Sequence, residues 1–328
     1  MEAMSMLNLD ESLKRKLISN QWLFLLIVIA LLSITAGFVN PRYFTIRNLS
    51  NLLSQVSVLS LVACGATILI ISGNFDISVG ANIGLSAVVM AMLIRSGLPV
   101  PVAAILGIGV AILSASFVGG SSILFHAPSF IISLASISVF QGLALALTGG
   151  TIQTIYGEFE ILGGAEIFGF IPLLFVVAIL GYVVVYYILN HTQLGRYVYA
   201  IGDNEQAAYL AGVKVNKNKM IFFVLNGLFV GIAAMLLLSR VGAAQPTTGS
   251  GIELKAIGSV VIGGAPMSGG KGNVVGTFFG VLLWGVIGNA LNMMQVSPFL
   301  QEVTIGLLIV FAVAITSLRL RAEKALMD

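Results

Sequence analysis

The chain has 328 residues, 58% of them hydrophobic and only 9% charged, and its formal net charge is +3. Soluble domains carry roughly 25% charged residues, so this composition indicates a protein that crosses a membrane many times. The small net charge gives no sign of a nucleic-acid partner. Cys64 is the only cysteine, which excludes an intrachain disulfide. The two histidines, His126 and His191, lie far apart without cysteine partners, so no metal site is expected.

Apolar runs along the chain predict the membrane spans. A helix needs about 20 apolar residues to cross a bilayer. Nine runs meet this length: 22–39, 49–72, 77–94, 100–125, 128–147, 168–189, 220–241, 274–294 and 299–318. A tenth, 254–264, is about half as long and has glycines at both ends, which predicts a half-helix lined by protein. The predicted fold is an all-α polytopic membrane protein with about ten transmembrane helices, one of them a half-helix.

The basic residues predict the orientation of these spans. Ten crossings place both termini on one side, and a cytosolic N-terminus satisfies the excess of Lys and Arg expected in inside loops. Eleven of the 16 Lys and Arg residues then lie inside. The other five lie outside: Arg42, Arg47, Arg95, Arg240 and Lys255. Without the half-helix, the orientation of every span after residue 241 inverts, and Arg319, Arg321 and Lys324 lie outside. The distribution of basic residues therefore favours ten crossings.

The ends of the chain are predicted to be cytosolic tails. Residues 1–21 carry leucines around Lys14, Arg15 and Lys16, which favours an interfacial helix, with a frayed tail as the alternative. Residues 319–328 form the second tail. The region between them, 22–318, is expected to be a single transmembrane domain.

The polar interval 191–219 lies between two apolar runs and is predicted to be cytosolic. Its middle, from Asn204 to Ala211, predicts a short helix, because Asn is a good N-cap and Glu, Gln, Ala and Leu favour helices. Gly202 and Gly212 are expected to end it on either side. Such a helix suits contact with a partner protein, and a plain solvated loop is the alternative.

Two glycine-rich breaks interrupt the apolar pattern, at residues 71–80 (ISGNFDISVG) and 261–272 (VIGGAPMSGGKG). Each leads from one apolar helix into another, which hints at an internal repeat. The second is not a phosphate-binding loop, because Ala265 stands at the first glycine position and Gly272 follows Lys271 where Ser or Thr is required.

Polar side chains within or beside the spans are candidates for the translocation path. Asp76 could cap the next helix, carry a proton or ion, or contact a substrate or partner. Amides suit hydroxyl-rich neutral solutes, and hydrogen bonds between helices are the alternative. The spacing of Asn289 and Asn292 places them on one helix face. The full candidate set is Asn74, Asp76, Ser78, Gln141, Asn226, Asn289 and Asn292.

Several segments together resemble the permease subunit of bacterial ribose-type ABC importers, the carbohydrate-uptake family. They cover nearly the whole chain in order: Ile71–Gly80, Pro128–Ile137, Leu145–Gly150, Thr192–Val213, Gly251–Thr277 and the NALNM motif at Asn289. Asn74, Ala81-Asn82 and the Lys255-Ala-Ile-Gly run depart from the family pattern. These departures leave the family assignment intact and leave open whether the solute is a pentose, hexose, polyol, nucleoside or signalling sugar.

The resemblance implies a partner set and a cellular location. It implies uptake of a sugar or sugar-like solute across the bacterial cytoplasmic (inner) membrane, with no catalytic residue or cofactor in this chain. ATP and Mg would be held by partner ATPase subunits. An extracytoplasmic solute-binding protein, a second permease copy or paralogue, and membrane lipid are the other expected partners. The family also implies that the ATPase docks on the polar interval 191–219, called the coupling segment below. The residues expected to take part are Gly195, Arg196, Gly202, Asn204, Glu205, Ala207, Ala208 and Gly212.

Two other functions compete with this one. An ion-coupled secondary transporter of a small polar solute would need ionisable groups within the spans, and only Asp76, Glu253 and Glu302 come near, all at span edges. A membrane-bound enzyme would need a nucleophile, a base or a metal cluster, and the sequence suggests none.

Overall fold

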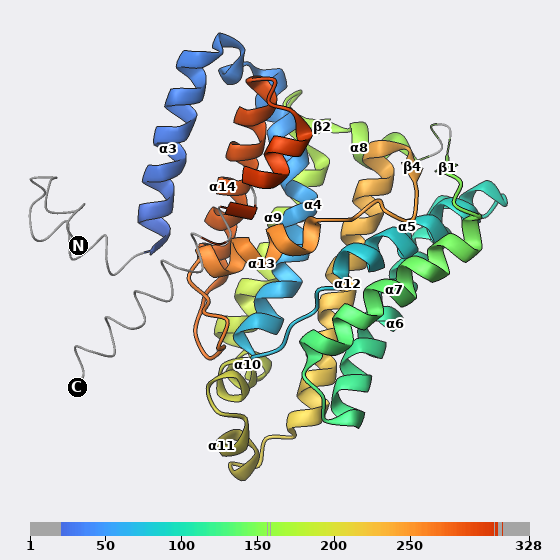
Figure 1. Cartoon of the computed structure of the whole chain (residues 1–328), viewed down its shortest axis with the longest axis vertical. Coiled ribbons are helices and arrows are strands. Elements are labelled where there is room, and N and C mark those ends of the chain that lie inside the picture. The colour runs from blue at the N-terminus through green and yellow to red at the C-terminus, as the bar shows by residue number, and fades with distance from the viewer. Residues whose placement is uncertain (1–20, 156, 158, 305, 308–309, 311–328) are drawn as a thin grey trace, which may run out of the picture.

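The computed structural model describes residues 21–155, 157, 159–304, 306–307 and 310, and these form a bundle of helices (Figure 1). The long helices are α3 (Gln21–Val39), α4 (Ile46–Ile71), α5 (Val79–Arg95), α6 (Val100–Phe125), α7 (Ser129–Thr148), α9 (Leu173–His191), α12 (Val215–Val241) and α14 (Val274–Met293). The short ones are the 3-10 helix η1 (Pro41–Phe44), α8 (Glu160–Gly164), α10 (Gln193–Asp203), α11 (Glu205–Leu210) and α13 (Ile252–Ile262). The predicted all-α polytopic fold is confirmed.

Residues 298–304 are also helical, and two small pairs of strands lie in the loops. Strand β1 (Gln153–Thr154) pairs antiparallel with β4 (Ala243–Ala244), although they lie far apart in the sequence. Strands β2 (Glu166–Ile167) and β3 (Ile171–Pro172) form a hairpin. Both pairs belong to the loops at one end of the bundle, beside α8, whereas α10 and α11 lie at the opposite end (Figure 1).

Seven helices among the described residues are long and apolar enough to cross a membrane: α3, α4, α6, α7, α9, α12 and α14. Helix α5 is apolar but has only 17 residues. The predicted half-helix is α13, which has 11 residues. Gly251 precedes it with φ 84° and Gly264 follows with φ 105°, left-handed conformations that glycine adopts without strain. Most of the last predicted span, 299–318, lies outside the described residues, as do nearly all of the first tail and the whole of the second.

Two predicted spans have different starting points in the structure. The run 168–189 was expected to be helical throughout, but α9 begins only at Leu173 because residues 166–172 form the β2–β3 hairpin. Phe168 and Gly169 have positive φ there, which makes the turn. The run 220–241 begins later than its helix, since α12 already starts at Val215. The polar residues before 220 therefore lengthen the helix beyond its apolar part.

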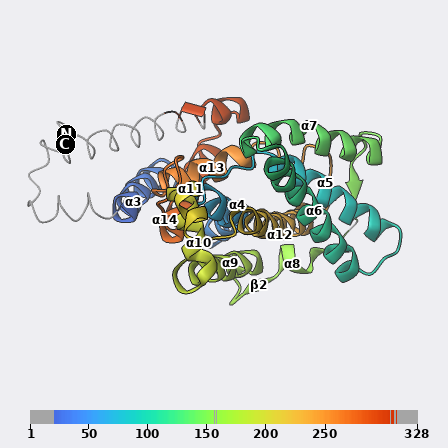
Figure 2. The ribbon, with the colours of Figure 1, turned by 90° about the horizontal axis from the view of Figure 1, so that it is seen from below.

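Helix α4 forms the centre of the bundle, and every residue from Val56 to Ile71 is buried. It packs against α9, α12, α13 and α14, and Figure 2 shows α4 and α12 in the middle when the bundle is seen from below. Elsewhere in the bundle, small residues let the backbones of α12 and α6 approach each other closely. A Cβ atom on Gly227 of α12 would lie 2.7 Å from the Cα of Ile112 in α6. Close backbone contact of this kind is how helices associate in lipid.

Candidate coupling site and translocation path

Helices α10 and α11 form because polar side chains cap them in succession. Thr192 accepts a hydrogen bond from the Gly195 amide at the start of α10, over 3.2 Å. Asn204 ends α10 and also caps α11, accepting from the Ala207 amide at 2.9 Å. The predicted short helix is therefore confirmed as α11, and the solvated loop is wrong.

The structure corrects the role predicted for Gly202 and adds a helix that the sequence did not suggest. Gly202 was expected to stop the chain before the short helix, but it lies inside α10, one residue before the last. Its missing side chain serves packing: a Cβ there would overlap the carbonyl oxygen of Ile71 and would lie 2.7 Å from the Gly270 amide nitrogen. Gly212, with φ 84°, does end the segment after α11.

The two glycine-rich breaks meet under α10. The amide of Gly270 in the second break donates to the Ile71 carbonyl in the first, over 2.8 Å. Tyr199 of α10 donates its hydroxyl to the Gly272 carbonyl at 3.0 Å. Partial burial raises the pKa of the Tyr199 phenol, which keeps it protonated and able to donate. Helix α10 therefore contacts both chain segments that lead into α5 and α14.

Helix α11 has one buried and one exposed face, which corrects the expectation that Ala207 and Ala208 both leave room for a partner. Ala207 is exposed, but Ala208 is only 5% exposed and belongs to the core. The free face instead carries Tyr209 and Leu210, which are 69% and 79% exposed. Large apolar side chains left in solvent are typical of a protein contact.

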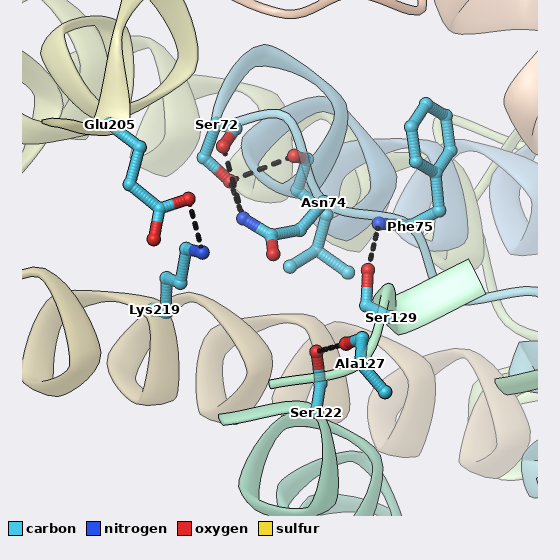
Figure 3. A network of polar contacts seen from close by, with 9 residues as sticks. Ser72, Asn74, Phe75, Ser122, Ala127, Ser129, Glu205 and Lys219 are labelled. Carbon is cyan, nitrogen blue, oxygen red and sulfur yellow. Dashed lines mark hydrogen bonds and ion pairs between the residues drawn. The ribbon is translucent and has the colours of Figure 1, made fainter. Parts of the chain in front are cut away.

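The other predicted coupling residues support this arrangement. Glu205 at the start of α11 forms an ion pair with Lys219 of α12, with 2.6 Å between Glu205 Oε2 and Lys219 Nζ (Figure 3). This ion pair links the two helices. Gly195 is buried against the backbone of Ile188 and Leu189, and Arg196 beside it is exposed. Arg196 thus faces outward from the start of α10.

Four of the seven path candidates lie close together, at the first glycine-rich break. Asp76 accepts hydrogen bonds from the Ser78 amide, at 2.9 Å, and from the Ser78 hydroxyl with the same oxygen. Its other oxygen accepts from Asn226 of α12 at 3.0 Å. Asn74 donates to the Ser72 carbonyl at 3.0 Å (Figure 3). These side chains are buried, so the carboxylate fixes the turn before α5 and binds it to α12.

The remaining path candidates lie elsewhere. Asn289 of α14 and Asn48 of α4 are buried and exchange two amide hydrogen bonds, of 2.9 and 3.0 Å. Asn292 is exposed and accepts a hydrogen bond from Gln301. Although Asn289 and Asn292 lie on one face of α14, the first is therefore buried and the second is in contact with solvent. Gln141 is half-buried on α7. Asn289 thus joins α14 to α4, and Asn226 joins α12 to the turn before α5.

One feature of the structure has no signal in the sequence. A cavity of about 210 Å³ lies between α4, α12, α13 and α14, beside residues 298–304. Its polar lining residues are Gln55, Arg240, Lys255 and Gln301. Arg240 and Lys255 had appeared only as two of the few outside charges, since residues far apart in sequence meet only in the folded bundle. No cluster of three potential metal ligands occurs among the described residues.

The chain is similar to known transport proteins along most of its length. The family model described as "Branched-chain amino acid transport system / permease component" matches residues 48–313. The ribose import permease protein of Bacillus subtilis (strain 168) is 39% identical over 295 residues, covering 89% of this chain and 89% of that protein. The xylose transport system permease protein of Haemophilus influenzae is 32% identical over 366 residues, 92% of this chain and 97% of its own. The fructose import permease protein of Rhizobium meliloti is 33% identical over 305 residues, 88% and 83% of the two chains. No solved structure matches the chain.

Proposed function

This chain belongs to the family of membrane permease components that its match over residues 48–313 defines, and on that premise we propose that it is the translocating subunit of an ATP-binding-cassette importer for a sugar or sugar-like solute. Its relatives are import permeases named for ribose, xylose and fructose, which favours a sugar over an amino acid as the solute. The protein is a multi-pass membrane protein and a transport subunit. ATP and Mg are held by a partner.

The contact of α10 with both glycine-rich breaks carries the proposal of how this subunit is driven. The exposed Tyr209 and Leu210 of α11 give an ATPase subunit an apolar surface to bind. A displacement of α10 acts directly on the Ile71–Gly270 contact, because Gly202 leaves no gap between them. The breaks lead into α5 and α14, so movement of the ATPase changes the position of two membrane helices. Packed backbone transmits such shifts better than flexible side chains do.

We assign the partners and the orientation to the two ends of the bundle. The ATPase subunits bind the α10–α11 end, which faces the cytosol and holds both termini on its side of the bacterial cytoplasmic membrane. The solute-binding protein docks at the opposite end, where α8 and the β1–β4 pair lie (Figure 1). A second permease copy or paralogue completes the translocation unit. Exposed apolar residues of α6 and α7, such as Leu113 and Ile131, face lipid or that second copy.

The buried carboxylate of Asp76 does not favour the ion-coupled alternative. Both oxygens of Asp76 accept hydrogen bonds from protein groups, so the carboxylate is engaged in holding the turn. Glu253 of α13 accepts from the Gly251 amide at 3.1 Å, and its side chain packs against Gly80 of α5. A coupling ion at Asp76 would have to displace these hydrogen bonds, whereas the second oxygen of Glu253 is buried without a partner among the described residues.

Substitution on the exposed face of α11 tests the proposal. The purified importer, made by co-expressing this chain with its ATPase, is compared as wild type, Ala207→Trp and Ala146→Trp. Ala146 is an exposed alanine on α7, away from α11, and serves as the matched control. We expect Ala207→Trp to insert normally but to retain less ATPase on co-purification and to lose at least about tenfold of ATP-dependent sugar uptake. If Ala207→Trp leaves ATPase retention and ATP-dependent sugar uptake unchanged, the exposed face of α11 is not the coupling site.

A further inference from the structure

The cavity beside the half-helix holds two cations without a protein partner. Arg240, near the end of α12, and Lys255, in the first turns of α13, both line it. The one ion pair among the described residues is Lys219 with Glu205, at the other end of the bundle. Among the described residues, neither Arg240 nor Lys255 makes a side-chain hydrogen bond or ion pair. Lys255 is half-buried and Arg240 stands exposed at the edge of the cavity, so both cations are free to bind an anionic group.

The nearest carboxylate on α13 is turned away from these cations. Glu253 lies two residues before Lys255, so the helix directs the two side chains to different sides. Glu253 accepts a hydrogen bond from the Gly251 amide and packs against Gly80 of α5, and it does not line the cavity. Among the described residues, the lining therefore includes two positive charges and no negative one.

The other polar groups of the cavity are mainly hydrogen-bond donors. Trp284 of α14 lines it and is only 5% exposed, and its indole N–H is buried without a partner in the described structure. Ile252, the first residue of α13, also lines it, which brings the positive end of the half-helix to the cavity. Gln301 already donates to Asn292 and the Val296 carbonyl. An unpartnered buried donor beside two free cations favours an acceptor-rich, negatively charged ligand.

The cavity is large enough for a small solute and is open to the surface. It is bordered by the first turns of α13 and the second half of α14, the two helices that the second glycine-rich break connects. Its volume of about 210 Å³ is many times that needed for one water molecule. Gln55 and Arg240 on its rim are exposed, so a solute can enter from the surface.

We propose that this cavity binds the transported solute and that the solute is a sugar carrying a negative charge, with Arg240 and Lys255 holding its acidic group. The inference rests on the proposed importer function and specifies its substrate class. A carboxylate and a phosphate group share this chemistry, because both accept charge-assisted hydrogen bonds from Arg and Lys. The Trp284 N–H and the Gln55 amide then serve the hydroxyl groups.

Uptake and binding by the complete importer test the proposal. The probes are D-gluconate, D-ribose 5-phosphate and the neutral sugars D-ribose and D-glucose. Their ATP-dependent uptake into cells is measured, and their binding to the purified permease–ATPase complex is measured by thermal shift. The variants are Arg240→Gln, Lys255→Gln, the charge-retaining Lys255→Arg and the control Arg42→Gln, which removes an exposed outside cation that does not line the cavity.

We expect one of the acidic sugars to be taken up and to stabilise the complex, and the two neutral sugars to do neither. Arg240→Gln and Lys255→Gln should each weaken binding by about tenfold or more, since each removes a charge-assisted contact. Lys255→Arg and Arg42→Gln should bind as wild type does. Preference for gluconate or for the phosphate ester identifies the acidic group.

Two results overturn the inference in distinguishable ways. ATP-dependent uptake of a neutral sugar, unaffected by Arg240→Gln and Lys255→Gln, leaves the importer function standing and removes the acidic solute. Failure of the chain to co-purify with any ATPase removes the importer function itself.

Discussion

The Cα atom of Gly202 lies against the carbonyl oxygen of Ile71 so closely that a methyl group on Gly202 would overlap that oxygen. This contact joins the α10–α11 end of the protein to the end of its most buried helix. It also lies beside the hydrogen bond from Gly270 to Ile71, so one residue of α10 controls the junction of both glycine-rich breaks.

Gly202→Ala should therefore displace α10 from this junction. Relieving such an overlap typically costs about 1–3 kcal/mol, and we expect a lower melting temperature of the purified complex together with ATP hydrolysis that no longer drives uptake. Gly142→Ala on α7 is the matched control, because a Cβ there meets nothing within 4 Å. If Gly202→Ala keeps wild-type coupling, the contact does not transmit motion.

Asp76→Asn should retain most transport. One oxygen of the new amide can still accept from Ser78. Its NH₂ group can donate to the Asn226 oxygen, which has no partner in the described structure, once the Asn226 amide turns over, because its NH₂ group points at position 76 in the wild type. Asp76→Leu removes both sets of hydrogen bonds and should lower the free energy of unfolding by roughly 2–4 kcal/mol. Uptake and thermal stability of both variants decide the question: Asp76→Asn protein that assembles normally but transports nothing would overturn the purely structural role of Asp76.

The Asn48–Asn289 pair should show energetic coupling. Each amide is buried and bonded to the other, so loss of one leaves the other short of a partner. In a double-mutant cycle with leucine at both positions, we expect a coupling of about 0.5–1.5 kcal/mol, the range for hydrogen bonds between membrane helices. Asn292→Leu, at an exposed position one turn along α14, is the control. Additive effects at 48 and 289 would contradict the pairing.

The Asp76–Asn226 and Asn48–Asn289 contacts mark the limit of what the sequence predicts. Hydropathy and glycine placement predicted the helices and the half-helix α13, because insertion into a bilayer depends on local apolar length. The short helix α11 was predicted from its Asn204 cap, which is also a local signal. The partners of Asp76 and Asn289 lie 150 and 241 residues away, and such contacts depend on how the helices pack.

The same limit explains the errors at the coupling segment. Gly202 was read as a helix end because glycine disfavours helices, but close packing on Ile71 selects glycine inside α10. The family resemblance places Ala208 among the docking residues, although this side chain faces the core. A six-residue helix shows too little periodicity for its buried face to be recognised from the sequence.

Single-cysteine labelling tests the orientation. In a Cys64→Ala background, cysteines at Gly157 and Ser297 should react with a membrane-impermeant reagent from outside, and a cysteine at Lys217 only after the cytosolic side is opened. All three positions are exposed, unlike the neighbouring Asn218, which is buried. Labelling of Lys217→Cys from outside in intact cells would invert the map.

The most direct measurement is solute uptake by the purified permease, ATPase and solute-binding protein in proteoliposomes, with labelled ribose, fructose and gluconate as probes. The importer function predicts that uptake requires ATP on the α11 side and continues when ionophores abolish every ion gradient. Uptake that proceeds without ATP and stops with the ionophores would contradict it.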